Sequence, residues 1–157
     1  MSQITVYTDG SSRGNPGPGG YGVVLMFGQH RKELSQGYRK TTNNRMELLA
    51  VIVALESIKR PELPVVIHSD SQYVINSIEK GWLWGWVKKG FKGKKNADLW
   101  QRFIPAYKRV NDVKLKWVKG HAGIPENERA DELATLAADH PPHLIDAGFE
   151  QEANTLL

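Results

Sequence analysis

Acidic side chains stand beside or inside apolar segments of this chain, where an isolated acid is costly. Asp9 follows the apolar stretch ITVY and opens the glycine-rich segment 8–22, Asp70 follows the apolar stretch PVVI closely, and Glu47 lies in the apolar segment 43–59. Gathered carboxylates repel one another unless a cation lies among them. Oxygen ligands favour a hard ion such as Mg²⁺, and two such ions roughly 4 Å apart can cleave a phosphodiester.

Each acid also has a plainer structural explanation. Asp9 fits an Asp-Gly turn, Glu47 complements a helix dipole, and Asp70 is a helix cap. Asp131, with Glu128 and Glu132 nearby, fits a solvated helix face. Taken singly, these residues leave the structural and the catalytic interpretations open.

The positive charge is concentrated in one segment, residues 80–95. It contains six lysines, no acid and three of the five tryptophans, whereas the whole chain carries a formal charge of +4. A solvated surface is the usual explanation of a lysine run. Aromatic rings between lysines instead suit a surface that packs against sugars or bases beside a phosphate backbone. Trp82 and Trp86 are four residues apart, so both could face the core from one helix.

Hydrophobic periodicity and turn residues predict the elements that must position these side chains. In chain order we expect strands at 4–8, 20–27 and 32–39, a helix at 43–59, a strand at 63–70, helices at 71–81 and 96–110, a strand at 113–119 and a helix at 125–139. The first three strands form an antiparallel meander. The strand-helix-strand order then places the fourth strand parallel to the first. Asp9 and Asp70, each expected to end its strand, thus converge at one sheet edge.

Length and composition limit the remaining possibilities. A chain of 157 residues fits one globular domain with a substantial core. It has no cysteine, no basic and apolar leader, and no apolar run longer than Leu48–Leu55, so we expect a cytoplasmic protein without a membrane segment. Residues 140–157 show weak periodicity and are expected to be loosely held.

Five ordered motifs resemble those of type 1 ribonuclease H, the bacterial kind. They are YTDGSSRGNPGPGGYG, TTNNRMELLAVIVALE, HSDSQYV, NADLWQ and WVKGHAGIPENERADELA. The resemblance implies an α/β ribonuclease H-like fold, a five-stranded mixed sheet with helices on both faces, in a catalytic domain at 1–139. It also implies endonucleolytic hydrolysis of the RNA strand of RNA/DNA hybrids, with 5′-phosphate and 3′-hydroxyl ends and little sequence preference.

The resemblance also assigns roles to individual residues. The metal-binding and catalytic carboxylates would be Asp9, Glu47, Asp70 and Asp131, and His121 would match a mobile histidine that assists proton transfer or product release. The cofactor would be two Mg²⁺ ions, with Mn²⁺ as a substitute. Residues 80–95 would form a basic handle that grips the DNA strand, and the enzyme is expected to be a monomer.

Substrate contacts are likewise implied by the resemblance. Asn15, Asn43, Asn44 and Gln72 would read minor-groove edges or hydroxyls, and Thr42 with Asn96 and Lys40 would hold a DNA phosphate. From the handle, the expected contacts are Trp82, Lys88, Lys89 and Lys92. Two other classes stay open: an integrase-like nuclease that shares Asp9 and Asp70, and a non-catalytic hybrid-binding module.

Overall fold

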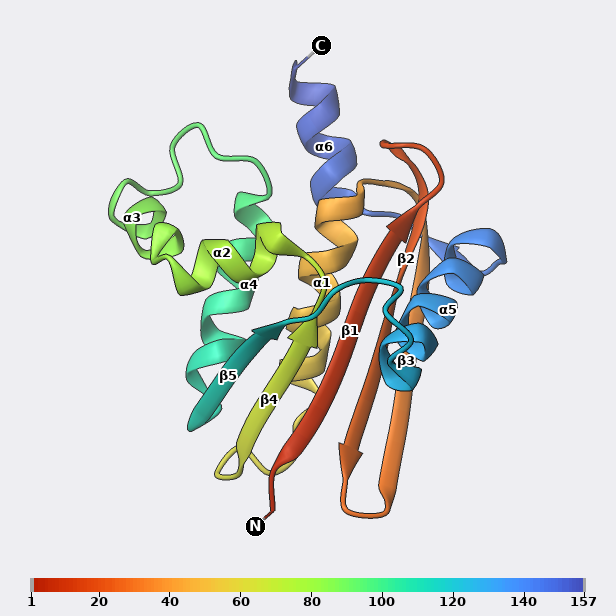
Figure 1. Cartoon of the computed structure of the whole chain (residues 1–157). Coiled ribbons are helices and arrows are strands. Elements are labelled where there is room, and N and C mark those ends of the chain that lie inside the picture. Colours follow the sequence, from red (N-terminus) through yellow and green to blue (C-terminus); the bar gives the residue numbers. More distant parts are fainter. Residues whose placement is uncertain (1, 157) are drawn as a thin grey trace.

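One mixed sheet organises the computed structural model, which describes residues 2–156, and its six strands run in the order β5-β4-β1-β2-β3-β6 (Figure 1). The strands are β1 (Ile4–Ser12), β2 (Gly17–Phe27), β3 (His30–Thr41), β4 (Pro64–Ser69), β5 (Asp112–Trp117) and β6 (His143–Leu144). The helices are α1 (Asn43–Glu56), α2 (Gln72–Glu79), α3 (Trp82–Lys88), α4 (Ala97–Lys108), α5 (Pro125–Asp139) and α6 (Ala147–Leu156).

The pairing confirms the predicted topology. β1, β2 and β3 form the antiparallel meander, and β4 runs parallel to β1 after the α1 crossover. β5 then adds in parallel to β4. The expected ribonuclease H-like mixed sheet has one strand more than predicted, because the two residues of β6 pair with β3 at an edge that would otherwise be open.

The expectation that the first strand ends at Asp9 is wrong. β1 continues to Ser12, because its antiparallel pairing with β2 extends from Thr5 opposite Met26 to Ser12 opposite Gly19. Asp9 therefore lies inside a strand, opposite Gly22. Much of the glycine-rich segment is sheet rather than turn, and Asp70 alone follows the end of its strand.

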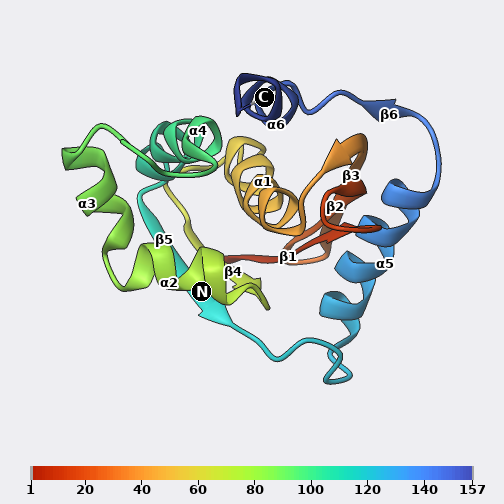
Figure 2. The ribbon, with the colours of Figure 1, turned by 90° about the horizontal axis from the view of Figure 1, so that it is seen from above.

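Helix α1 lies against one face of the sheet, with α4 and α6 beside it, while α5 covers the opposite face (Figure 2). Helix α1 is apolar on nearly all sides, and ten of its residues are buried, as expected for a helix that has neighbours all round. The helix begins after Thr42, whose side chain accepts a hydrogen bond from the Arg45 backbone N–H. It ends at Glu56, three residues before the predicted end.

Residues 140–157 were expected to be loosely held, but the described part of this segment forms β6 and α6. Its anchor is Asp146, which is 8% exposed and accepts hydrogen bonds from Thr41 Oγ1 and Arg45 Nε, both at 2.7 Å. A single buried polar anchor leaves no trace in apolar periodicity, which explains why the sequence did not reveal it. The placement of the catalytic domain at residues 1–139 stays a prediction.

Among the helices within residues 2–156, none is long and apolar enough to cross a bilayer.

Candidate active site

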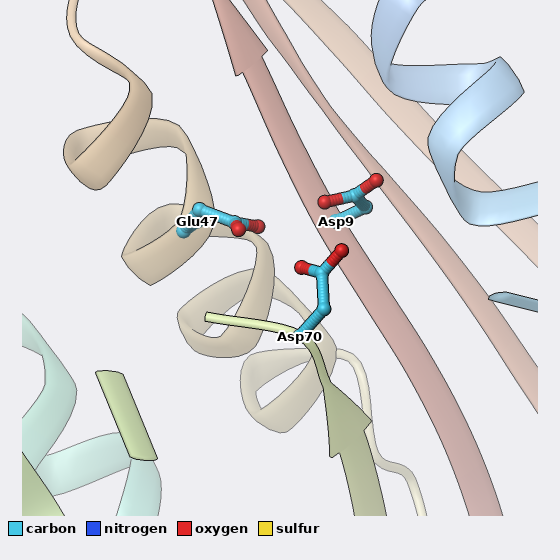
Figure 3. A group of neighbouring side chains, drawn as sticks. All are labelled: Asp9, Glu47 and Asp70. Atoms are coloured by element: carbon cyan, nitrogen blue, oxygen red, sulfur yellow. The ribbon is translucent and has the colours of Figure 1, made fainter. Parts of the chain in front are cut away.

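Three acids lie together near the carboxyl end of β4, where this strand runs beside β1 (Figure 3). Asp9 comes from β1, Glu47 from the second turn of α1, and Asp70 directly follows β4. One carboxylate oxygen from each lies within 4.8 Å of the others. The structure therefore brings together three of the four acids that the sequence singled out.

Close backbone approach makes this meeting possible. A Cβ atom on Gly10 would lie 2.2 Å from the backbone nitrogen of Glu47, so only glycine lets α1 pack this tightly beside Asp9. On the other strand, Ser71 is the N-cap of α2 and accepts a hydrogen bond from the Val74 N–H. The cap role that Asp70 could have filled thus belongs to its neighbour, and the Asp70 carboxylate is left for the cluster.

Burial sets the electrostatics of the cluster. Asp9 is 5% exposed and Glu47 is 6% exposed. Desolvation, with repulsion from Asp70 as the next cause, raises the pKa of Asp9 to about 8, although the Gly10 N–H donates to Asp9 Oδ1 at 2.9 Å. Desolvation and the charges of Asp9 and Asp70 also raise the pKa of Glu47 well above its ordinary value. These acids resist ionising together.

The residues present suit a divalent cation. Glu47 Oε1 is buried and lacks a hydrogen-bond partner, which is costly for a carboxylate oxygen. Within residues 2–156, none of the ion pairs formed by lysine or arginine includes Asp9, Glu47 or Asp70. All three ligand atoms are hard oxygens, so the cation that suits them best is Mg²⁺ or a similar ion.

The fourth acid, Asp131, lies on α5 beside Asp9. The closeness of its carboxyl group to that of Asp9 contributes to the raised pKa of Asp9. This position depends on Gly22, which faces Asp9 across the β1–β2 pair and where a Cβ would lie 2.2 Å from the Ala130 carbonyl oxygen. Helix α5 can therefore pack directly on the strand. Asp131 does not belong to the three-acid group but borders it.

The loop between β5 and α5 carries His121 past the acids. His121 is exposed and has a left-handed backbone, with φ of 57°. At the preceding residue, Gly120, a Cβ would lie 2.7 Å from Asp70 Oδ2, so the loop backbone runs against the cluster. His121 therefore follows directly after the residue at which the loop passes Asp70, and its side chain is exposed.

Several of the predicted substrate-binding residues surround a separate cavity of about 350 Å³. It is lined by Asn15, Pro16, Thr42, Asn44, Lys95, Asn96, Phe149, Glu152 and Ala153. Asn43 borders it through its backbone N–H, which donates to Asn15 Oδ1 at 3.1 Å. Lys40 is exposed at the end of β3, and Gln72 is exposed in the first turn of α2; neither lines this cavity.

In the basic handle, the tryptophans divide between surface and core. Trp82 is 48% exposed, with Lys80 Nζ 5.4 Å from its ring centre, whereas Trp86 packs edge-on against the buried Trp100. Of the two rings that could have faced the core, Trp86 does so, whereas Trp82, one of the predicted substrate contacts, is exposed because α3 buries Leu83 instead. Three further predicted contacts are exposed: Lys88, Lys89 and Lys92.

Sequence reasoning missed a buried ionic network next to the cavity. Arg45, 1% exposed, forms paired hydrogen bonds with Asp98 and with Asp146. An arginine inside the apolar segment 43–59 was the available signal, since a buried charge requires partners. Its partners could not be found from the sequence because they lie 53 and 101 residues further along the chain.

Comparisons with known proteins give a consistent result. The RNase H family model matches residues 1–139. The chain is 55% identical to a ribonuclease H of Desulforamulus reducens, over 90% of this chain and 91% of that protein, and 52% identical to one of Klebsiella pneumoniae subsp. pneumoniae, over 98% and 99%.

Solved structures of related enzymes share the fold. LC9-RNase H1, a type 1 RNase H with the type 2 active-site motif, matches with a TM-score of 0.80 and 34% identity, over 98% of this chain and 81% of that chain. LC11-RNase H1, in a crystal structure with an RNA/DNA hybrid, matches with a TM-score of 0.65 and 28% identity, over 87% and 97%.

The raised pKa of Asp9 predicts how stability depends on pH without divalent metal. Its pKa is about 8 in the folded protein and 3.8 for an ordinary aspartate. The stabilising contribution of the protonated form is therefore complete below pH 3.8 and is lost as the pH rises through about 8. By differential scanning calorimetry in EDTA, Asp9→Asn should melt about 4 °C or more above the wild type at pH 8 and within about 2 °C of it at pH 4.

The control is Asp112→Asn, which removes an equal charge at an exposed site on β5 and should follow the wild type across this range. Equal melting temperatures of Asp9→Asn and the wild type at pH 8 would contradict the account of a strained acid cluster.

Proposed function

This chain belongs to the ribonuclease H family, and we propose that it cleaves the RNA strand of RNA/DNA hybrids endonucleolytically by a two-metal-ion mechanism. The products would carry 5′-phosphate and 3′-hydroxyl ends. The observation that carries the proposal is the buried cluster of Asp9, Glu47 and Asp70, with an unpartnered oxygen on Glu47. Such a cluster destabilises the protein unless it serves to bind cations.

Four carboxylates would hold the ions: Asp9, Glu47, Asp70 and Asp131. When bound, Mg²⁺ or Mn²⁺ supplies an acidified water and neutralises charge on the phosphate and the leaving oxygen. The burial of Asp9 and Glu47 limits the access of bulk water, which strengthens each electrostatic interaction in the site. Asp131, which the packing of α5 on the sheet brings beside Asp9, would be the fourth ligand.

His121 would transfer protons rather than bind metal. Its loop passes Asp70 at Gly120 and leaves the imidazole exposed. Its exposed imidazole would accept a proton at one ring nitrogen and pass it to solvent during the reaction or product release.

Recognition would depend on the shape and hydroxyls of the hybrid. Amide side chains both donate and accept, so Asn15, Asn43, Asn44 and Gln72 would contact any base edge or a 2′-hydroxyl. The cavity between Thr42 and Asn96 would receive one phosphate of the DNA strand, assisted by the exposed Lys40 at the end of β3. A relative that binds an RNA/DNA hybrid in its crystal structure supports this choice of substrate.

The handle would hold the DNA strand beyond the site. Trp82 offers an exposed ring next to a lysine, and Lys88, Lys89 and Lys92 are exposed after it. Rings and ammonium groups side by side bind sugars and phosphates without selecting a sequence. We also propose that the enzyme acts as a monomer in the cytoplasm, where a chain without cysteine suits a reducing compartment.

The proposal is tested with labelled RNA/DNA, RNA/RNA and DNA/DNA duplexes, each incubated with Mg²⁺ or with a chelator. We expect cleavage of the RNA strand of the hybrid alone, and only with metal. Asp70→Asn should lower kcat by about 10³-fold or more, while hybrid affinity stays equal or tightens because a negative charge near phosphates is gone.

Asp112→Asn serves again as the control and should cleave like the wild type. Cleavage of duplex DNA would indicate an integrase-like nuclease. Hybrid binding by the wild type without any cleavage would indicate a binding module. Activity of Asp70→Asn within about tenfold of the wild type would overturn its assignment as a metal ligand.

The handle makes a separate prediction about salt. If Lys88, Lys89 and Lys92 contact phosphates, replacing all three by alanine should raise KM and lower the slope of log K against log salt by up to about three units. The kcat should change little, because the acids lie elsewhere. The matched control replaces Lys32, Lys59 and Lys108, which are exposed outside the handle. Equal effects of the two triple variants would mean that net charge, and not the handle, determines affinity.

A further inference from the structure

Asp146, in the segment after α5, forms hydrogen bonds with two residues next to the candidate phosphate cavity. Asp146 is 8% exposed and lies just before α6. Its carboxylate accepts a hydrogen bond from Thr41 Oγ1 at 2.7 Å, and from Arg45 Nε and Nη2 at 2.7 and 2.9 Å. Asp146 also starts α6, because its Oδ1 accepts from the Phe149 N–H at 3.3 Å.

Arg45 carries this connection to the opposite wall. Its Nη1 donates to Asn96 Oδ1 at 3.3 Å and to Asp98 Oδ1 at 2.9 Å. Asn96 in turn donates from Nδ2 to the Tyr73 hydroxyl at 3.1 Å, so the orientation of its amide is fixed at both ends. A planar guanidinium held by carboxylates on two sides cannot rotate without breaking several hydrogen bonds.

Helix α6 packs onto this network and closes the cavity. At Gly148, a Cβ would lie 2.0 Å from Asp98 Oδ2 and 2.8 Å from Arg45 Nη2, so the helix backbone lies directly on the ion pair. The next turns of the helix place Phe149, Glu152 and Ala153 along the cavity. One wall of the cavity therefore comes from residues beyond the range 1–139 that the family model matches.

We propose that Asp146 is a positioning residue for the DNA strand, acting through Thr41 and Arg45 to fix the spacing between Thr42 and Asn96. On one side it holds the residue that precedes Thr42, and on the other it holds the guanidinium that orients the Asn96 amide. Substrate binding in this cavity then depends on the C-terminal segment. The inference rests on the proposed function, because it assigns a phosphate of the hybrid to this cavity.

The test uses hybrids in which one DNA-strand phosphate at a time is a neutral methylphosphonate. In the wild type, one linkage should raise KM by about tenfold, which identifies the phosphate that occupies the cavity. Asp146→Asn should raise KM on the unmodified hybrid by about five- to tenfold, with kcat within about twofold. For Asp146→Asn, the same methylphosphonate should raise KM by less than a further factor of about two. The reason is that the substitution and the methylphosphonate remove the same interaction.

Two other variants separate positioning from loss of folding. Thr41→Val removes one hydrogen bond to Asp146 and leaves the Arg45 pair intact, so it should shift KM in the same direction by a smaller factor. Glu150→Gln, the control, breaks an exposed ion pair between α6 and Arg39 and should leave KM unchanged. Circular dichroism and melting temperature establish that each variant is folded.

The outcomes distinguish the two proposals. A wild type that does not cleave hybrids would overturn the proposed function. A wild type that cleaves them overturns this inference alone if no methylphosphonate linkage raises KM. The inference also fails if the sensitive linkage raises KM as much for Asp146→Asn as for the wild type, or if folded Thr41→Val and Glu150→Gln have equal KM values.

Discussion

Mutual repulsion among buried carboxylates is the constraint around which this fold is arranged. Asp9 and Glu47 are nearly inaccessible, and Asp70 lies against both, so its charge opposes the ionisation of Asp9 and Glu47. The sheet and α1 must hold them together against that repulsion. Glycine supplies the means, since a side chain at Gly10 or Gly22 would push α1 or α5 away from β1. The stability lost at the cluster would be recovered by the divalent cation that we propose it binds.

The first two turns of α1 connect this cluster with the rest of the molecule. Thr42 caps the helix and lines the cavity proposed to hold a DNA phosphate, Arg45 lies in the buried ionic network, and Glu47 belongs to the acid cluster. Because the three residues share one rigid helix end, a displacement of any one of them also moves the other two. The C-terminal segment acts on the same turns through Asp146, which links a region outside the family match to the substrate side of the site.

The parts of the structure that follow from local pattern were predictable. The meander, the α1 crossover and the parallel placement of β4 were confirmed, and with them the approach of Asp9 to Asp70. Long-range polar contacts were not predictable: nothing near Arg45 in the sequence indicates Asp146, and weak periodicity concealed α6. The four-residue spacing of Trp82 and Trp86 left open which ring packs inward, and the structure shows that it is Trp86. The roles of the individual site residues stay predictions.

The acid cluster is expected to retain protons until a cation replaces them. Isothermal titration of the metal-free protein with Mg²⁺ at pH 7, in buffers of different ionisation enthalpy, measures the protons released. Because the pKa of Asp9 is about 8 and that of Glu47 is also raised, Mg²⁺ binding should release about one proton or more per protein. The apparent enthalpy would then vary with the buffer. Binding enthalpies that are identical in all buffers would mean that the acids are already ionised, and would contradict the account.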